Sequence, residues 1–162
     1  MPRAGSFLLM VFLLSQRVAV GCEMADQAAF AEPLGSPISG DSAHLASPFG
    51  MLFHPLLQEM RMHTGVDWAA PTGTPIAALR GGRITETGRR GQFGNIVVID
   101  HGAGWRTLYA HLSKMNVVLG DCVKAGDEIG EVGVTGLTSG PHVHLELLQY
   151  GWPVDPLKSH EP

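Results

Sequence analysis

Cysteine is scarce in this chain, because Cys22 and Cys122 are the only two among 162 residues. Two cysteines cannot form the network of several disulfides that holds many small secreted domains together. The folded state is therefore expected to depend on an apolar core or on a metal ion. Cys122, between Asp121 and Val123, is expected to be a half-buried strand residue without a functional role.

Clusters of basic residues are also missing. The 11 Lys and Arg residues are scattered and are outnumbered by 15 Asp and Glu residues, which gives a net charge of −4. This balance argues against a nucleic acid as partner. The length fits one domain with an extra segment and excludes two full domains.

The chain lacks an apolar run of the length that a permanent transmembrane helix needs, because residues 7–14 fall well short of about 20 residues. Arg3 precedes this run and the small residues Ala19, Val20 and Gly21 follow it, which is the layout of a signal peptide over residues 1–22. We expect export to the periplasm or cell envelope. Lipidation at Cys22, which would anchor the protein to a membrane, is an alternative to cleavage without lipid, although Ala19 stands where lipoprotein signals usually have leucine.

Apolar stripes of helical period are nearly absent, whereas many of the 21 glycines separate short runs rich in Val, Ile and Thr. This pattern is typical of strands joined by tight turns and predicts an all-β domain. Strands are expected at residues 75–79, 83–87, 95–101, 105–111, 127–132 and 142–148. Residues 23–47 are expected to be a linker, residues 48–157 the folded domain and residues 158–162 a tail.

Two of the histidine spacings suit a metal site. His63 and Asp67 lie four positions apart, and Gly65 between them can turn the chain so that both side chains reach one cation. His142 and His144 lie two positions apart in an apolar run. Residues two apart in a strand point to the same face, so both imidazoles and Glu146 should project to one side. Val143, Leu145 and Leu147 should face the packed side.

Each of these spacings is a weak indication by itself, but together they supply imidazoles and a carboxylate. Two neutral imidazoles and one carboxylate form a typical ligand set for catalytic zinc, which leaves a fourth position for water. Such a zinc ion lowers the pKa of its water to about 7 and polarises a carbonyl group, which is the chemistry of amide hydrolysis. The spacing alone does not separate the role of His142 from that of His144.

Four segments, in this order, resemble motifs of the lysostaphin/LytM-type zinc metallopeptidases, which are peptidoglycan endopeptidases. Residues 61–76, which include His63 and Asp67, are similar to the opening motif of that family, and residues 94–101 to its central strand. Residues 108–113 contain the Tyr-Ala-His-Leu motif around His111, and residues 135–146 match the closing motif with His142 and His144. The resemblance covers about residues 47–157.

This resemblance implies that His63, Asp67 and His144 bind one zinc ion and that His111 and His142 are catalytic histidines. It also implies a compact antiparallel β-sandwich, sometimes described as a duplicated hybrid motif, with the metal site in a groove. The implied activity is hydrolysis of peptide cross-links in bacterial peptidoglycan by a metal-activated water. Peptide stems or cross-bridges would be the binding partners, and the protein is expected to be a monomer.

The sequence departs from the family at Leu52, where many relatives have arginine, and more mildly at Phe93 and Ser139. A non-catalytic peptidoglycan-binding or hydrolase-activating module of the same fold is the main alternative, and a sugar-binding β-domain is a weaker one. All five positions that the family needs are filled, which favours the enzyme. No ligand role is expected for the remaining histidines, His44, His54, His101 and His160. The peptide bond that is cut is not evident from the sequence.

Overall fold

The structure is a computed structural model that describes residues 21–160. The predicted signal peptide, residues 1–22, therefore lies almost entirely outside the described residues. Within the described part, the helical segments are three short 3-10 helices, η1 (Gln27–Phe30), η2 (Gly40–Ser42) and η3 (Gly91–Phe93). None of the described helices is long and apolar enough to cross a membrane. The regular structure is otherwise β-strand, which confirms the predicted all-β class.

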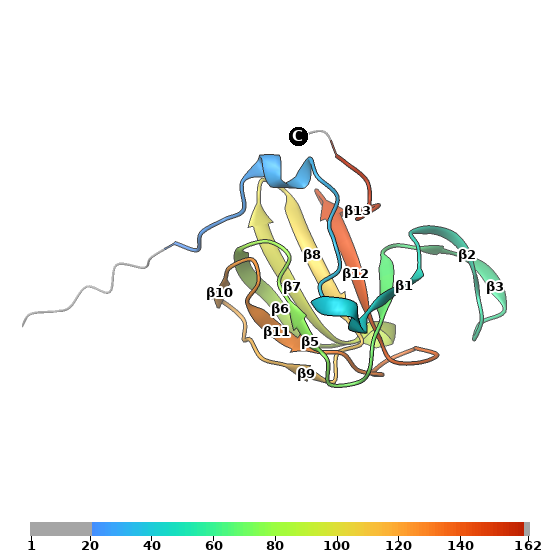
Figure 1. The fold of residues 1–162 in the computed structure, drawn as a ribbon. Helices are drawn as coiled ribbons and strands as arrows, with labels where there is room; N and C mark the ends of the chain where they lie inside the picture. The colour runs from blue at the N-terminus through green and yellow to red at the C-terminus, as the bar shows by residue number, and fades with distance from the viewer. Residues whose placement is uncertain (1–20, 161–162) are drawn as a thin grey trace, which may run out of the picture.

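A large antiparallel sheet forms one layer of the molecule (Figure 1). Its strands follow the order β1 (His44–Ser47), β4 (Val66–Ala69), β12 (His142–Gln149), β8 (Trp105–Ala110), β7 (Gly94–Gly102), β6 (Gly82–Arg90) and β10 (Cys122–Val123). A further strand, β13 (Trp152–Val154), pairs with the far half of β12. β12 is an interior strand between β4 and β8, so His142 and His144 lie away from the edges of the sheet.

The second layer is a small antiparallel sheet of β5 (Pro75–Ala77), β11 (Glu128–Glu131) and β9 (Lys114–Met115). Its Ile76 and Ile129 are fully buried in one cluster with Val97, Tyr109 and Val143 of the large sheet. The Tyr109 hydroxyl accepts a hydrogen bond from the backbone N–H of Leu79, so the aromatic ring is packed and its polar tip is satisfied. The core lies between the two layers, and the predicted β-sandwich is confirmed.

Alternation along β12 separates the packed face from the face that carries polar chemistry. Val143 and Leu145 enter the core between the sheets, and Leu147 extends this apolar surface. His144 and Glu146, on the intervening positions, lie on the opposite face together with the His142 ring. The predicted two-residue period is therefore confirmed.

A two-stranded hairpin, β2 (Gly50–His54) and β3 (Glu59–His63), projects from the sandwich beside β1 and β4 (Figure 1). The apolar residues Met51, Phe53, Met60 and Met62 pair across its two strands and remain exposed. The sequence did not predict this hairpin, because strand patterns are recognised by apolar residues that face a core, and these residues face none.

Residues 23–47 differ from the expected linker, because they pack along the sandwich as an N-terminal strap. Phe30, Leu34 and Ile38 are each at most 3% exposed. The Arg80 guanidinium donates two hydrogen bonds to the Ala29 carbonyl at 3.2 and 2.9 Å, and the Leu34 N–H donates to the Pro156 carbonyl. Phe30 and Leu34 pack in one cluster with Trp105 and Leu147, and Ile38 joins the main core cluster.

The expected strand position of Cys122 is confirmed, but its expected partial burial was wrong. Cys122 is exposed at the start of β10 and forms a disulfide with Cys22, 100 positions earlier in the chain. This bond ties the beginning of the strap to the edge of the large sheet. The Cys22 sulfur cannot carry a lipid thioether and this disulfide at the same time, so the pairing is incompatible with the lipidation alternative.

Candidate active site

The three predicted metal ligands converge on one face of the large sheet. His63 Nε2 lies 3.1 Å from Asp67 Oδ1 and 3.0 Å from His144 Nδ1, and His144 Nδ1 lies 2.8 Å from Asp67 Oδ1. Two ligand atoms at about 2.0–2.1 Å from a tetrahedral zinc ion are roughly 3.3 Å apart. This compact triangle of two nitrogens and one oxygen therefore fits a zinc ion, and His63, Asp67 and His144 would hold it.

Strand pairing explains how residues so far apart in sequence meet. Asp67 on β4 is directly opposite His144 on β12 in the antiparallel ladder, and directly opposed side chains on one face are close neighbours. His63 arrives from the end of β3, where its Nδ1–H donates to the Pro48 carbonyl at 2.7 Å. That hydrogen bond leaves Nε2 as the metal-facing atom of His63.

Gly65 allows the chain to approach β12 closely between His63 and Asp67. A Cβ atom at this position would lie 2.3 Å from the Leu145 carbonyl oxygen and 2.9 Å from His144 Cε1. Gly65 was predicted to turn the chain between the two ligands. The structure shows instead that close backbone contact is what requires glycine at this position.

A second layer of contacts orients His144. Its Nε2 lies 3.4 Å from a carboxylate oxygen of Glu146, and the Thr64 hydroxyl donates to the same oxygen. Glu146 is buried, so it is neither a solvated carboxylate nor an exposed groove wall. A carboxylate on the outer nitrogen fixes the ring orientation and raises the basicity of a metal-binding imidazole.

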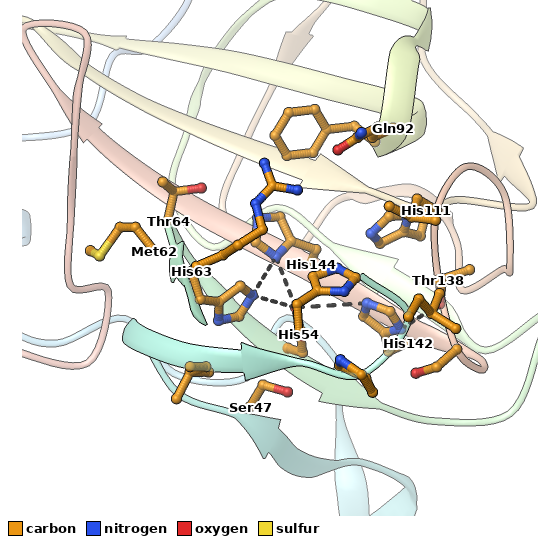
Figure 2. A pocket seen from close by; sticks show the side chains of 18 of the residues that line it. Ser47, His54, Met62, His63, Thr64, Gln92, His111, Thr138, His142 and His144 are labelled. Atoms are coloured by element: carbon orange, nitrogen blue, oxygen red, sulfur yellow. Dashed lines mark hydrogen bonds and ion pairs between the residues drawn. The ribbon is translucent and has the colours of Figure 1, made fainter. Parts of the chain in front are cut away.

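His111 and His142 form a second pair beside the triangle, with ring centroids 4.7 Å apart (Figure 2). His111 Nδ1–H donates to the Thr135 carbonyl at 2.8 Å, and His142 Nδ1–H donates to the Gly140 carbonyl at 2.9 Å. Each Nε2 is left available for the site, and His142 Nε2 lies 3.7 Å from Asp67 Oδ1. The two rings can therefore accept or return protons next to the metal-binding triangle.

The backbone at His111 supports a special role for this position. His111 directly follows β8 and adopts a φ of +64°, which is uncommon for a residue with a side chain. The neighbouring hydrogen bond from His111 N–H to the Phe93 carbonyl holds this conformation. Backbone strain of this kind persists where the surrounding structure enforces it, often at functional sites.

The charges of the triangle are strongly coupled. Burial alone would raise the pKa of Asp67, but hydrogen bonds with His144 and His63 outweigh this effect and hold that pKa well below its ordinary value. Burial would lower the pKa of His144, yet its hydrogen bonds with Asp67 and Glu146 raise that pKa to about 9. The two carboxylates therefore stabilise positive charge between the three donor atoms, and a divalent cation supplies such charge.

His111 has the opposite electrostatic setting. Burial lowers the pKa of His111 to about 4, although the hydrogen bond to the Thr135 carbonyl favours the charged ring. The ring is consequently neutral at pH 7, with a free electron pair on Nε2. A neutral imidazole of this kind can serve as a general base.

A groove runs over these side chains (Figure 2). One wall comes from the β2–β3 hairpin, and other parts come from η3 and from the turn before β12. Residues from these segments that line the groove are Leu52, His54, Arg61, Met62, Gln92, Phe93, Thr138 and Ser139. The predicted placement of the histidines and Asp67 in a groove agrees with this arrangement.

Sequence reasoning missed two contributions to the groove. His54, for which only a ligand role had been excluded, ends β2 and lines the groove wall. Thr138 places its hydroxyl 3.1 Å from His142 Nδ1 and thus helps to orient that ring. The position of Thr138 in the turn that leads to His142 was an available sequence signal, whereas nothing local to His54 indicated its place.

Comparison with known proteins agrees with this arrangement. Residues 61–156, more than half of the chain, match the model of peptidase family M23. The catalytic domain of the antimicrobial peptidase lysostaphin from Staphylococcus simulans is 34% identical, with a TM-score of 0.64. That similarity covers 70% of this chain and 89% of the lysostaphin domain.

Two curated relatives are similar in the same region. The DD-carboxypeptidase/endopeptidase Mpg of Neisseria meningitidis serogroup B is 50% identical over 113 residues, which cover 70% of this chain and 26% of Mpg. The peptidoglycan DD-endopeptidase ShyA of Vibrio cholerae serotype O1 is 41% identical over 109 residues, which cover 67% of this chain and 25% of ShyA. The chain thus spans about a quarter of the length of these relatives. The resemblance to lysostaphin-type enzymes is confirmed, and the chain belongs to peptidase family M23.

Proposed function

We propose that this protein is a zinc-dependent endopeptidase that hydrolyses peptide cross-links of bacterial peptidoglycan. One observation carries the proposal: the donor triangle of His63, Asp67 and His144 lies next to two imidazoles whose Nδ1 atoms are bound to backbone carbonyls. A metal site and a pair of proton-transferring groups therefore share one groove. Membership of a family does not by itself establish the substrate of one member, so the choice of peptidoglycan rests on the names of similar proteins.

The donor set favours zinc over magnesium or calcium, because two imidazole nitrogens and one carboxylate oxygen suit zinc, whereas the other two prefer oxygen ligands. A zinc ion in such a site supplies a Lewis acid for the scissile carbonyl and a source of hydroxide near neutral pH. Glu146 and the Pro48 carbonyl would keep His144 and His63 in the ligand orientation.

His111 and His142 would handle the protons of the reaction. Each ring is fixed through its Nδ1–H and presents Nε2 to the groove. One ring takes a proton from the attacking water, and the other stabilises the oxyanion or delivers a proton to the leaving amine. The groove walls would hold the peptide extended across the site.

The names of the relatives support peptidoglycan as substrate. ShyA is named a peptidoglycan DD-endopeptidase, and Mpg a DD-carboxypeptidase/endopeptidase. Both names favour a bond between two D-configured centres as the one that this chain cuts. Peptide stems and cross-bridges of peptidoglycan are accordingly the proposed partners.

The test is digestion of purified peptidoglycan with the zinc-loaded protein, followed by mass analysis of the released fragments. We expect new amino termini that a chelator abolishes and added zinc restores. His142→Ala, loaded with zinc, is the matched control and should release almost nothing. Tight binding to peptidoglycan without any cleavage by the wild-type protein would favour the non-catalytic alternative instead.

We also propose that the protein is exported and that cleavage leaves Cys22 on the mature chain, so that the signal peptide ends before residue 22 and not at it, as the sequence had indicated. The Cys22–Cys122 disulfide supports this, because disulfides persist in oxidising compartments such as the periplasm. Mass spectrometry of the protein from its native host, with and without reduction, tests the proposal. A mature protein that keeps Met1, or a Cys22 that carries lipid, would contradict it.

A further inference from the structure

We propose that Arg61 binds a carboxylate of the substrate peptide and makes the groove selective for anionic peptides. This inference rests on the proposed peptidase function and adds a substrate feature to it. Arg61 lies on β3, two positions before His63, and both residues line the groove. Residues two apart in a strand share a face, so Arg61 projects from the same side of the hairpin as the metal ligand.

The spacing between Arg61 and His63 places Arg61 a short distance from the metal triangle along a bound peptide. Two residues of strand advance the chain by roughly 7 Å, and a residue of extended peptide spans about 3.3–3.6 Å. If the scissile amide of a peptide lies at the metal triangle, a substrate residue no more than about two positions away from that amide therefore lies beside Arg61. A carboxylate on this nearby residue is the natural partner of a guanidinium, which binds it through two parallel hydrogen bonds.

The guanidinium N–H groups of Arg61 are only weakly engaged by other groups of the protein. Its nearest carboxylate belongs to Glu59, with 3.6 Å between Nε and Oε1, and the two side chains are 44% and 60% exposed. An ion pair this long and this exposed contributes little. The guanidinium is consequently free to exchange Glu59 for a substrate carboxylate.

The charge of the groove differs from the charge of the whole chain. Among the described residues that line the groove, Arg61 is the single Lys or Arg and Asp67 is the single Asp or Glu. Behind the groove, the buried Glu146 contacts His144 and adds a second negative charge, so a divalent cation would leave this site with one net positive charge when the histidines are neutral. The chain as a whole carries −4. A positive groove in an acidic protein favours an anionic ligand at this place.

Two synthetic peptides with the same scissile amide test the proposal. One carries a free carboxylate on the neighbouring residue, and the other carries a carboxamide at that position. We expect the zinc-loaded wild-type chain to cleave the carboxylate peptide with a kcat/KM about 10- to 100-fold higher, which is the scale of a hydrogen bond to a charged group. Arg61→Gln should lose this preference by slowing only on the carboxylate peptide, and Arg61→Lys should keep part of it.

Arg83→Gln is the matched control, because Arg83 is an exposed arginine on β6 outside the groove. It should preserve the preference. Zinc content and thermal stability should be equal in all variants. A wild-type protein that cleaves both peptides equally, or an Arg61→Gln variant that slows equally on both, would overturn the assignment.

A binding measurement separates this proposal from the peptidase proposal. Calorimetry on zinc-loaded His142→Ala gives the Kd of each peptide without turnover, and adding Arg61→Gln to that variant should remove the preference for the carboxylate. If the wild-type protein cleaves neither peptide, the peptidase proposal is in doubt, but the binding preference still decides the role of Arg61. Equal Kd values for both peptides would overturn that role.

Discussion

His142 and His144 occupy equivalent places in the sequence pattern, but their surroundings in the structure differ. His144 Nδ1 touches Asp67 and His63, and its outer nitrogen faces buried Glu146. His142 is anchored to the Gly140 carbonyl and Thr138, and its Nε2 is 3.7 Å from Asp67. These contacts support the proposed roles of His144 as a metal ligand and of His142 as a proton carrier.

This difference predicts different effects of two substitutions. His144→Ala should lose zinc and activity together, because two remaining ligands hold the ion poorly. His142→Ala should keep zinc and the fold while activity falls by roughly a hundredfold or more, the scale of losing a general acid or base. Zinc content by elemental analysis and fragment release from peptidoglycan are the measurements. Loss of zinc in His142→Ala with retention in His144→Ala would reverse the roles.

His101 is a buried histidine with a structural role. It is 1% exposed, its Nδ1–H donates to the Gly81 carbonyl at 2.7 Å, and its Nε2 accepts from the Thr107 hydroxyl at 2.9 Å. Phe30 of the strap lies against its ring. The neutral tautomer satisfies both nitrogens, and burial lowers the pKa of His101 below its ordinary 6.5.

The lowered pKa predicts that acid destabilises the fold through His101. Below pH 6.5 His101 is protonated in the unfolded chain but stays neutral in the folded chain. The contribution of His101 to stability is therefore complete above pH 6.5 and is lost as pH falls from 6.5 through the folded pKa. The slope is at most about 1.4 kcal/mol per pH unit. Urea unfolding at pH 7.5 and 5.5 should show a smaller loss for His101→Gln than for the wild type. An equal loss in both proteins would refute this assignment.

At the scale of elements, the N-terminal strap acts as part of the domain. Phe30 is 1% exposed and stacks on Trp105 with ring centroids 4.8 Å apart. The strap thereby covers the apolar surface of Trp105 and Leu147, which the small sheet does not cover. The disulfide to Cys122 fastens the start of the same segment.

We therefore expect Phe30→Ala to lower the free energy of unfolding by about 3 kcal/mol or more, as for other buried Phe-to-Ala changes. Phe53→Ala is the matched control, because Phe53 is 61% exposed and its replacement should change stability by only about 0.5 kcal/mol. Chemical denaturation of both variants is the measurement. Similar stability changes in the two would show that the strap does not contribute to the fold as proposed.

At the scale of the whole molecule, the core and the metal triangle are separate. The core cluster lies between the two sheets, whereas the triangle lies on the outer face of the large sheet. Removal of zinc should therefore abolish hydrolysis but leave the β-sandwich folded. An ion that binds only the folded state stabilises it, so removal of zinc should also lower the melting temperature. The free energy of unfolding should fall by about 2.7 kcal/mol if the free zinc concentration had been a hundredfold above its Kd.

Far-ultraviolet circular dichroism and thermal melts with and without chelator test this separation. The strand spectrum should persist, and zinc should restore both activity and melting temperature. Asp67→Ala, which lacks a ligand, should show no shift on chelation. Loss of the strand spectrum in chelator would mean that the metal is needed for the fold itself.

Local patterns in the sequence determined the strand class and the chemistry of the site. Six strands were predicted from glycine spacing and apolar runs, and all six occur within a few residues of their expected places. The alternation of His142, His144 and Glu146 with buried residues followed from the two-residue period of a strand. Spacing predicted His63 and Asp67 as metal ligands, whereas the expected role of His111 and the expected difference between His142 and His144 came from the motif resemblance.

Tertiary structure decided the features that depend on distant partners. Asp67 meets His144 because β4 pairs with β12, and Cys22 meets Cys122 across 100 positions of sequence. The burial of the strap and the position of the β2–β3 hairpin beside the site could not be predicted from the sequence for one physical reason. Burial of Phe30 depends on a surface built by β8 and β12, and the place of Arg61 beside the site depends on where the hairpin docks. The surface that buries Phe30 and the surface on which the hairpin docks form only when the sheets have formed. The local sequence therefore does not indicate either of them.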